Sequence, residues 1–232
     1  MRLLALESSA KAASVAVIDD GRLLGQYWLN CGLTHSRTLL CMSDSLLSDA
    51  NISLRDLDAI AVSIGPGSFT GIRIGIAAAK GLAWASNLPA CGVSTLEAMA
   101  MPLYDRTDTV ICSVMDARLK QVYNARFVAM GHRIERICED RAISISELEE
   151  EICTDGRVHL LVGDGAELCY NAMRKEERFI RLIPEPLRFQ SAFGVGIAAL
   201  NHDLQDPSDL TPNYLRLSQA ERERLAKDGK LR

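Results

Sequence analysis

A glycine-rich turn between an apolar run and a helical pattern is the part of this sequence best suited to chemistry. The run Ala59–Val62 leads into Gly65, Pro66 and Gly67, and small and aliphatic residues follow over Ile72–Ala85. Such a strand–turn–helix unit gathers backbone N–H groups and the positive end of a helix dipole, which predicts an anion site. The turn lacks the Lys-Ser/Thr pair that completes a Walker-type phosphate loop, and its proline removes one donor. The pattern therefore indicates a nucleotide-binding fold with reduced chemistry.

Metal-dependent and nucleophilic chemistry have little support elsewhere in the sequence. The four histidines, at positions 35, 132, 159 and 202, show no metal-ligand spacing with one another or with Asp, Glu or Cys. No Gly-x-Ser-x-Gly elbow is present, and Ser68 with Thr70 is better placed to cap the helix that follows. The seven cysteines are scattered, odd in number and without a CxxC pair, which favours reduced thiols in a cytoplasmic protein. We therefore expect no metal site and no disulfide framework.

The charge balance argues against a protein that holds RNA alone. The 232 residues include 26 Lys and Arg against 30 Asp and Glu, a formal net charge of -4. Because net charge does not describe distribution, a local basic patch stays compatible with this composition, and we expect any RNA contact to be shared with a partner. The apolar run Met1–Leu6 is too short for a signal peptide. No run approaches the roughly 18 apolar residues that would cross a membrane.

The elements that would position these residues occur twice along the chain. Each copy begins with three strands joined by turns and continues with a strand, a glycine turn and a helical pattern, which indicates two duplicated α/β lobes. In the first copy the strands are Leu3–Leu6, Ser14–Ile18, Arg22–Trp28 and Ile60–Ile64. In the second copy the corresponding segments are Val110–Met115, Val122–Val128, Arg133–Ile137 and His159–Val162.

This plan resembles that of the actin, sugar-kinase and Hsp70-like (ASKHA) superfamily, whose nucleotide cleft lies between two lobes. We place the first lobe at residues 1–103, a smaller second lobe at 104–218 and a charged tail at 219–232. In that superfamily, acids at strand ends hold magnesium-bound water near the phosphates, a role open to Glu7 and Asp116. The alternative is that these carboxylates cap nearby backbone N–H groups. The candidate vestigial nucleotide cleft comprises Glu7, Ser8, Gly65, Gly67, Ser68, Asp116, Gly163 and Asp164.

Several short segments resemble the signature of the TsaB (YeaZ) family. The resemblance implies a bacterial partner subunit for making threonylcarbamoyladenosine in tRNA, next to the anticodon. It also implies pairing with a catalytic paralogue, TsaD, and work beside a small ATPase, TsaE. The matching segments run in the family's order along nearly the whole chain: Gly65–Gly71 (GPGSFTG), Ile72–Gly75, Ala79–Ala83, Gly92–Ala98, Met115–Arg118, Gly163–Gly165 and Pro212–Arg216.

The resemblance further implies that the metal site of the transferase is lost. TsaD carries a His-x-x-x-His pair after a comparable turn and helix, and that pair falls on Thr95 and Met99 in this chain. Neither side chain is a good ligand for a hard metal. The same loss argues against a metallopeptidase.

Two helical segments carry the expected partner interface. The helix from about Thr70 to Ser86 has glycine and alanine at helical spacings, which let a second helix approach closely, and the helix from about His35 to Asp49 has an apolar stripe. The inner faces of both would cover the sheet of the first lobe. The resemblance implies a four-helix contact with TsaD, or with a second copy when TsaD is missing. The residues assigned to this interface are His35, Leu39, Met42, Leu46, Ile72, Gly75, Ile76, Ala79 and Ala83.

Together these observations predict a two-lobed protein without chemistry of its own, which positions TsaD while the latter modifies tRNA. No cofactor of its own is expected, ATP is expected only within the complex, and tRNA is expected to be reached through the complex. The alternative is a small-molecule kinase or ATPase that acts in its own interlobe cleft. The oligomeric state of the free chain, and whether the charged tail touches tRNA, stay open at this point.

Overall fold

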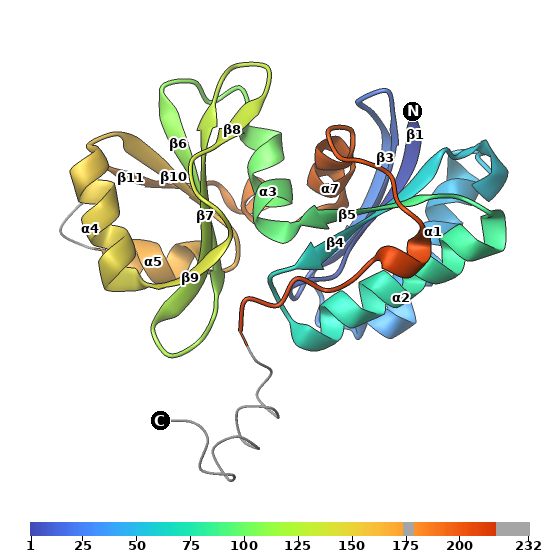
Figure 1. Cartoon of the computed structure of the whole chain (residues 1–232), viewed down its shortest axis with the longest axis horizontal. Helices are drawn as coiled ribbons and strands as arrows, with labels where there is room; N and C mark the ends of the chain where they lie inside the picture. The colour runs from blue at the N-terminus through green and yellow to red at the C-terminus, as the bar shows by residue number, and fades with distance from the viewer. Residues whose placement is uncertain (174–178, 217–232) are drawn as a thin grey trace, which may run out of the picture.

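The computed structural model describes residues 1–173 and 179–216, which form two α/β lobes side by side (Figure 1). Each lobe is built on one sheet. The first sheet has the strand order β3-β2-β1-β4-β5, and the second has the order β11-β10-β6-β7-β8, with β9 also paired to β7. Read from its other edge, the second sheet has the strand order β8-β7-β6-β10-β11, which matches β3-β2-β1-β4-β5 strand for strand. The predicted duplicated α/β fold is therefore confirmed.

In both sheets the first three strands pair antiparallel and the later strands pair parallel. The central parallel strands are buried on both faces, which is why the sequence shows them as unbroken apolar runs. The first sheet contains β1 (Arg2–Glu7), β2 (Ala13–Asp19), β3 (Arg22–Leu29), β4 (Ala59–Gly65) and β5 (Ala90–Ser94). The second sheet contains β6 (Thr109–Asp116), β7 (Gln121–Ala129), β8 (Ile134–Arg136), β9 (Arg141–Ser144), β10 (Val158–Val162) and β11 (Ile180–Leu182).

Helices cover both faces of the first sheet. α1 (His35–Asp49) and α2 (Phe69–Ser86) share a hydrophobic core with one face, and α7 (Ala192–Ala199) packs on the other. α3 (Thr95–Ala100) lies between the lobes, because it contacts β4 and β5 on one side and β6 and β7 on the other. In the second lobe, α4 (Ile145–Asp155) and α5 (Ala166–Ala172) cover the face away from α3. The short turns are α6 (Glu185–Arg188), η1 (Leu54–Asp56), η2 (Met101–Leu103) and η4 (Pro207–Asp209).

Helix α7 lies on the first lobe, whereas the prediction assigned all of residues 104–218 to the second lobe. The second sheet begins at Thr109, but α7 packs against β1, β2 and β4 of the first sheet. The Cβ that would be added at Gly194 lies 2.0 Å from the Ala98 carbonyl oxygen, so this helix needs glycine to fit against α3. The chain comes back from the second lobe to the first at α7 because this helix has no polar face, so it is stable only where apolar surface covers it. The predicted tail at 219–232 lies outside the described residues.

Candidate functional sites in the cleft and on the helical face

A cavity of about 890 Å³ opens between the two lobes, near the carboxyl ends of β1, β4, β6 and β10. Four of the eight residues predicted for the cleft do not line this cavity, because the next residues along the chain, such as Ser9 and Pro66, form its wall in front of them. The predicted residues that line the cavity are Gly67, Ser68, Asp116 and Asp164. Those that are buried behind the wall are Glu7, Ser8, Gly65 and Gly163.

The glycine turn before α2 is filled by the chain itself. The backbone N–H of Ser68 donates to the carbonyl oxygen of Ser9 at 2.6 Å, and the N–H of Gly71 donates to the Ser68 hydroxyl at 3.2 Å. A Cβ added at Gly67 would lie 2.4 Å from that same Ser9 oxygen, and one at Gly71 would lie 2.1 Å from the Ser8 oxygen. The glycines therefore allow the turn after β1 to pack on the start of α2. Two of the donors expected to hold an anion are already used within the fold.

Glu7 lies in the core of the first lobe. Its carboxylate accepts a hydrogen bond from the Ser9 N–H at 2.5 Å, and the side chain is fully buried. Burial raises the pKa of this carboxyl above its ordinary value. A group that holds magnesium-bound water beside phosphates must face the cleft, which Glu7 does not. Its contact with Ser9 is the capping role that the sequence left as the alternative.

The two aspartates of the second lobe do reach the cleft. Asp116 accepts a hydrogen bond from the Arg118 N–H at 2.8 Å, which is again a capping contact at a strand end. Asp164 accepts a hydrogen bond from the Gln190 amide at 3.1 Å. Gln190 is 1% exposed, and its side-chain oxygen Oε1 has no hydrogen-bond partner among the described residues. Both carboxylates therefore help to shape the wall of the cavity.

The segment Asn213–Arg216, which we call the C-terminal strap, crosses the mouth of the cavity. The Tyr214 ring stacks on Phe69 with centroids 3.9 Å apart and planes within 9°. The Arg73 guanidinium lies over the Phe69 ring at 4.3 Å and its Nε donates to the Tyr214 hydroxyl at 2.9 Å. This cluster fastens the strap to the first turn of α2.

Two further hydrogen bonds join the strap to both lobes. The Asn213 N–H donates to the carbonyl oxygen of Ile64 at the end of β4 (2.8 Å), and the Arg216 guanidinium donates to that of Ala117 after β6 (2.6 Å). Sequence reasoning matched this segment to the family but gave it no structural role. The only available signal was the aromatic residue Tyr214 in a polar stretch.

Most residues of the predicted partner interface lie on the inner sides of α1 and α2. Eight of its nine residues are buried inside the first lobe. Gly75 illustrates the reason, since a Cβ there would lie 2.4 Å from the Ser8 hydroxyl and 3.3 Å from Val62. The small residues of this face let α2 approach the turn after β1 and the sheet. His35 is half-buried, and its Nε2 lies 2.7 Å from the Ala10 carbonyl oxygen. The buried eight are Leu39, Met42, Leu46, Ile72, Gly75, Ile76, Ala79 and Ala83.

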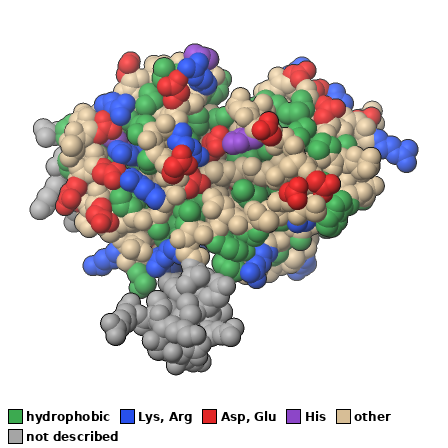
Figure 2. Space-filling view, in the orientation of Figure 1, with side chains coloured by type: hydrophobic (Ala, Val, Ile, Leu, Met, Phe, Trp, Pro, Cys, Tyr) green, Lys and Arg blue, Asp and Glu red, His purple; other side chains and the backbone are tan. Residues whose placement is uncertain are grey.

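The opposite side of α2 is an exposed and largely apolar strip, and Leu40 and Cys41 of α1 extend it among polar neighbours such as Asp44. Trp84 is 59% exposed and Leu40 is 49% exposed. A Cβ added at Gly81 would have no heavy atom within 4 Å, so the helix surface is open there. Hydrophobic side chains are visible in Figure 2 over the part of the first lobe where Figure 1 places α1 and α2. We call the following set the outer helical face: Leu40, Cys41, Ala77, Gly81, Trp84 and Ala85.

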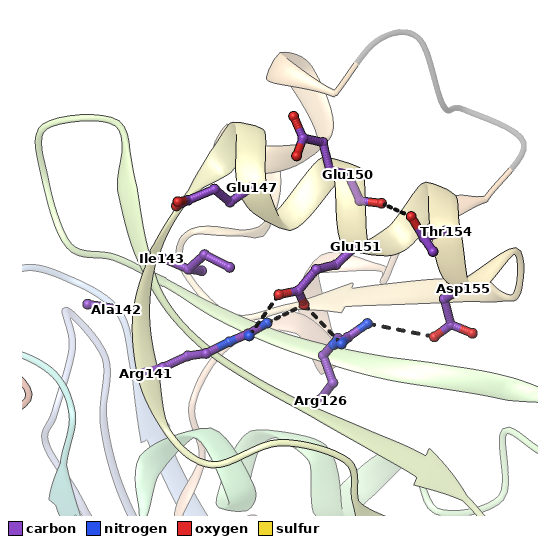
Figure 3. A pocket seen from close by; sticks show the side chains of 9 residues that line it. All are labelled: Arg126, Arg141, Ala142, Ile143, Glu147, Glu150, Glu151, Thr154 and Asp155. Atoms are coloured by element: carbon purple, nitrogen blue, oxygen red, sulfur yellow. Dashed lines mark hydrogen bonds and ion pairs between the residues drawn. The ribbon is translucent and has the colours of Figure 1, made fainter.

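A second concavity, of about 810 Å³, lies between α4 and strands β7 and β9 of the second lobe (Figure 3). Arg141 donates two hydrogen bonds to the Glu151 carboxylate, at 2.9 and 2.5 Å, and Arg126 pairs with the same carboxylate at 2.9 Å. The hydrogen bond from Arg141 holds the pKa of Glu151 below its ordinary value. These ion pairs brace α4 against the sheet. Glu147 accepts hydrogen bonds from Ser144, and exposed Glu150 has no ion-pair partner among the described residues, so the charge left over in this concavity is negative.

The described residues contain no group of three or more His, Cys, Asp or Glu side chains that could hold a metal ion. Thr95 and Met99, which stand at the ligand positions of the TsaD pair, are 0% and 3% exposed. No helix within residues 1–173 and 179–216 has the length and apolar character to span a membrane.

Comparison with known proteins decides the family. A family model described as "TsaD: tRNA N6-adenosine threonylcarbamoyltransferase" matches residues 31–183. The "tRNA threonylcarbamoyladenosine biosynthesis protein TsaB" of Buchnera aphidicola is 32% identical over 70% of this chain and 78% of its own length. The chain belongs to the TsaB (YeaZ) family. The protein of the same name from Bacillus subtilis is 29% identical over 95% of this chain and 96% of its own length.

Other family members match over different shares of their length. The TsaB of Escherichia coli is 41% identical over 128 residues, a match that spans 55% of either protein. The solved structure of YeaZ from Pseudomonas aeruginosa superposes with a TM-score of 0.74 at 26% identity, over 92% of this chain and 99% of that one. A component of the Acidaminococcus fermentans (R)-2-hydroxyglutaryl-CoA dehydratase has a TM-score of 0.51 at 10% identity, which is a likeness of fold alone.

Proposed function

We propose that this chain is a non-catalytic partner of TsaD in the formation of threonylcarbamoyladenosine in tRNA, next to the anticodon. The observation that carries the proposal is the outer helical face, an exposed apolar strip on a chain whose relatives are named as tRNA threonylcarbamoyladenosine biosynthesis proteins. On this proposal the chain docks TsaD, works beside TsaE in the cytoplasm and reaches tRNA through the assembly.

The composition of the outer helical face suits a second helix. Ala77, Gly81 and Ala85 are spaced four residues apart on one side of α2, so a partner helix can approach with its backbone close. Two cations border this strip. Arg73 lies one turn before Ala77, and Lys80 lies one turn before Trp84, with its ammonium group donating to the Ser208 carbonyl oxygen at 2.9 Å. The apolar part of the strip is therefore centred on Ala77, Gly81, Trp84 and Ala85.

Trp84 supplies the energetic anchor of this proposed contact. Its side chain is 59% exposed, so docking can cover on the order of 100 Å² of apolar surface, or about 2.5 kcal/mol at 25 cal/mol per Å². Tryptophan is among the residues that dominate binding energy at protein interfaces. Leu40 on α1 extends the same surface. Two neighbouring helices with this exposure fit a contact with a pair of helices on TsaD.

We assign no reaction to the interlobe cleft. A nucleotide held as in ASKHA enzymes needs free N–H donors at the glycine turn and an acid that faces the phosphates. The Ser68 and Gly71 donors bond Ser9 and Ser68 instead, and Glu7 is buried. The residues present do not fit that mode of binding, so no cofactor of its own is proposed, and ATP use is assigned to the assembly. The action of the chain is then conformational: by binding one arrangement of TsaD better than others, it raises the population of that arrangement.

Reconstitution tests the proposal directly. The full chain should show no transferase or ATPase turnover alone, and it should restore tRNA modification to TsaD supplied with TsaE, ATP and the threonylcarbamoyl donor. The Trp84→Ala variant should restore much less at equal concentration, while Leu168→Ala, an exposed leucine of the second lobe, should behave as the unmodified chain. Modification of tRNA by the chain alone, or full activity of TsaD without it, would refute the assignment.

A further inference from the structure

Basic side chains gather where the turns of both lobes meet at the mouth of the cleft. Lys11, Arg118 and Arg216 line the same cavity although they come from the β1–β2 turn, the β6–β7 hairpin and the C-terminal strap. Arg73 joins them through its hydrogen bond to Tyr214, and Lys120 lies two residues beyond Arg118 in the hairpin. We call these five residues the basic edge. Figure 2 shows Lys and Arg side chains along the lower border of the molecule, where Figure 1 places the β6–β7 hairpin and the start of α2.

The positive charge of the basic edge is largely uncompensated. Among the described residues, Lys11, Arg73, Lys120 and Arg216 form no ion pair, and Arg118 pairs with Asp116 at 3.7 Å while its side chain stays 84% exposed. The arginines of the second concavity, by contrast, share Glu151 (Figure 3). A protein with a net charge of -4 thus holds a cluster of free cations at one border.

The carboxylates of the cavity compensate this cluster only in part. Asp116 pairs with Arg118, and Glu167 lies 3.5 Å from the Arg188 guanidinium. Asp164 accepts a hydrogen bond from the neutral Gln190 amide; burial raises its pKa, and the charge of Lys11 works against that rise. Arg73, Lys120 and Arg216 are left without an acidic partner among the described residues.

We propose that the basic edge binds the phosphate backbone of RNA, as the surface through which this chain holds the tRNA presented to TsaD. The inference rests on the proposed function and adds a direct RNA contact to it. Separate cations on four different segments, exposed except for the half-buried Arg216, match a chain of regularly spaced phosphates better than they match one small anion. Tyr214 of the strap holds Arg73, and the Ala117 carbonyl oxygen holds Arg216, so part of the surface is ordered before RNA arrives.

RNA binding at this edge is compatible with docking on the outer helical face. Arg73 lies in the first turns of α2 and Trp84 lies near its end, eleven residues further on, which is about 16 Å along the helix axis. Ala77 of the outer helical face lies only one turn beyond Arg73, so the two surfaces adjoin there. Lys11, Arg118 and Lys120 lie off α2, so these three can be changed while the outer helical face stays intact.

The experiment uses the complex of the full chain with TsaD and an unmodified tRNA transcript as the probe. Fluorescence anisotropy gives the dissociation constant over a series of salt concentrations, for the wild-type complex and for the triple variant Lys11→Gln, Arg118→Gln and Lys120→Gln. All three side chains are exposed and lie off α2, so folding and docking should be unchanged. The slope of log K against log salt should become shallower by about 3, close to one for each lost phosphate contact, and affinity at about 0.15 M salt should fall about 10- to 100-fold.

Controls separate this inference from its rivals. Arg55→Gln removes an exposed cation just before β4, at the end of the sheet away from the cleft, and should leave both slope and affinity unchanged. Unchanged affinity and slope in the triple variant would overturn the inference, as would binding of the wild-type complex to vesicles of phosphatidylserine but not to tRNA. Co-purification of TsaD with each variant reports on the proposed function separately, because a failed complex and a lost RNA contact give different results.

Discussion

The Ser9 carbonyl oxygen accepts a 2.6 Å hydrogen bond from the backbone N–H of Ser68, at the position where the glycine turn approaches the cleft. The two residues are 59 positions apart in the chain, and their contact closes the start of α2 against the turn after β1. The turn resembles a phosphate loop in sequence, but in the structure it packs the start of α2 against the turn after β1. This contact is the physical basis for assigning no nucleotide chemistry to the free chain.

Gly71 should be intolerant of alanine because of this packing. The new Cβ would lie 2.1 Å from the Ser8 carbonyl oxygen, so the backbone must shift, and we expect a loss of about 1 to 3 kcal/mol in the free energy of unfolding. The matched control is Gly81→Ala in the same helix, where no heavy atom lies within 4 Å. Alanine is the better helix former, so that variant should gain up to about 1 kcal/mol. Urea unfolding gives the free energy of unfolding of both variants. Equal free energies would contradict the close contact between Gly71 and Ser8.

Substitutions on the exposed side of α2 should weaken the binding of TsaD. Gly81→Leu places a bulky side chain where a partner helix is expected to approach, and we expect at least a tenfold loss in affinity for TsaD with an unchanged unfolding midpoint. Glu150→Leu adds the same side chain on the exposed side of α4 and should not change affinity. Surface plasmon resonance with immobilised TsaD provides the measurement. Gly75→Leu, on the buried side, should instead destabilise the fold itself.

His202 should make stability depend on pH. Its Nε2 lies 3.0 Å from the Glu97 carboxylate, and this hydrogen bond raises the pKa of His202 above its ordinary value. A His whose pKa is higher in the folded state adds stability that is fully present below its unfolded pKa, about 6.5, and is lost as pH rises through the folded value.

The His202→Gln variant should therefore lose most stability relative to the unmodified chain at low pH, and the difference should shrink as pH rises above about 6.5. Urea unfolding at a series of pH values measures this difference. Buried His159 has a lowered pKa and acts in the opposite direction, but it is present in both proteins and cancels. A difference that grows with pH would refute the pairing.

The C-terminal strap should be held mainly by its aromatic stack. Tyr214→Ala removes the ring that lies 3.9 Å from Phe69, and we expect faster hydrogen exchange over the strap and a stability loss of about 1 to 2 kcal/mol. Tyr214→Phe keeps the stack and removes only the hydrogen bond from Arg73, so its loss should stay near or below about 1 kcal/mol. If the two variants behave alike, the hydroxyl and not the ring holds the strap.

Sequence reasoning succeeded where the signal was local. Apolar runs, turn glycines and their repetition identified the strands and the duplicated lobes, and Ser68 was recognised as the cap of α2, because each of these depends on neighbouring residues. The residues chosen for the partner interface depended on which side of each helix faces outward, and that is not a local property. Most side chains of α2 are small or apolar, so the spacing of its apolar residues does not reveal which side of the helix meets the sheet.

The sequence alone determined that the chain is an α/β protein with two related lobes and a helix-opening glycine turn. Only the tertiary structure decided that Gly71 and Gly75 face Ser8, that α7 returns to the first lobe and that Tyr214 closes on Phe69. These contacts join residues far apart in the chain, and their energies depend on shape and distance. No pattern of neighbouring residues encodes those quantities, so they appear only when the lobes pack.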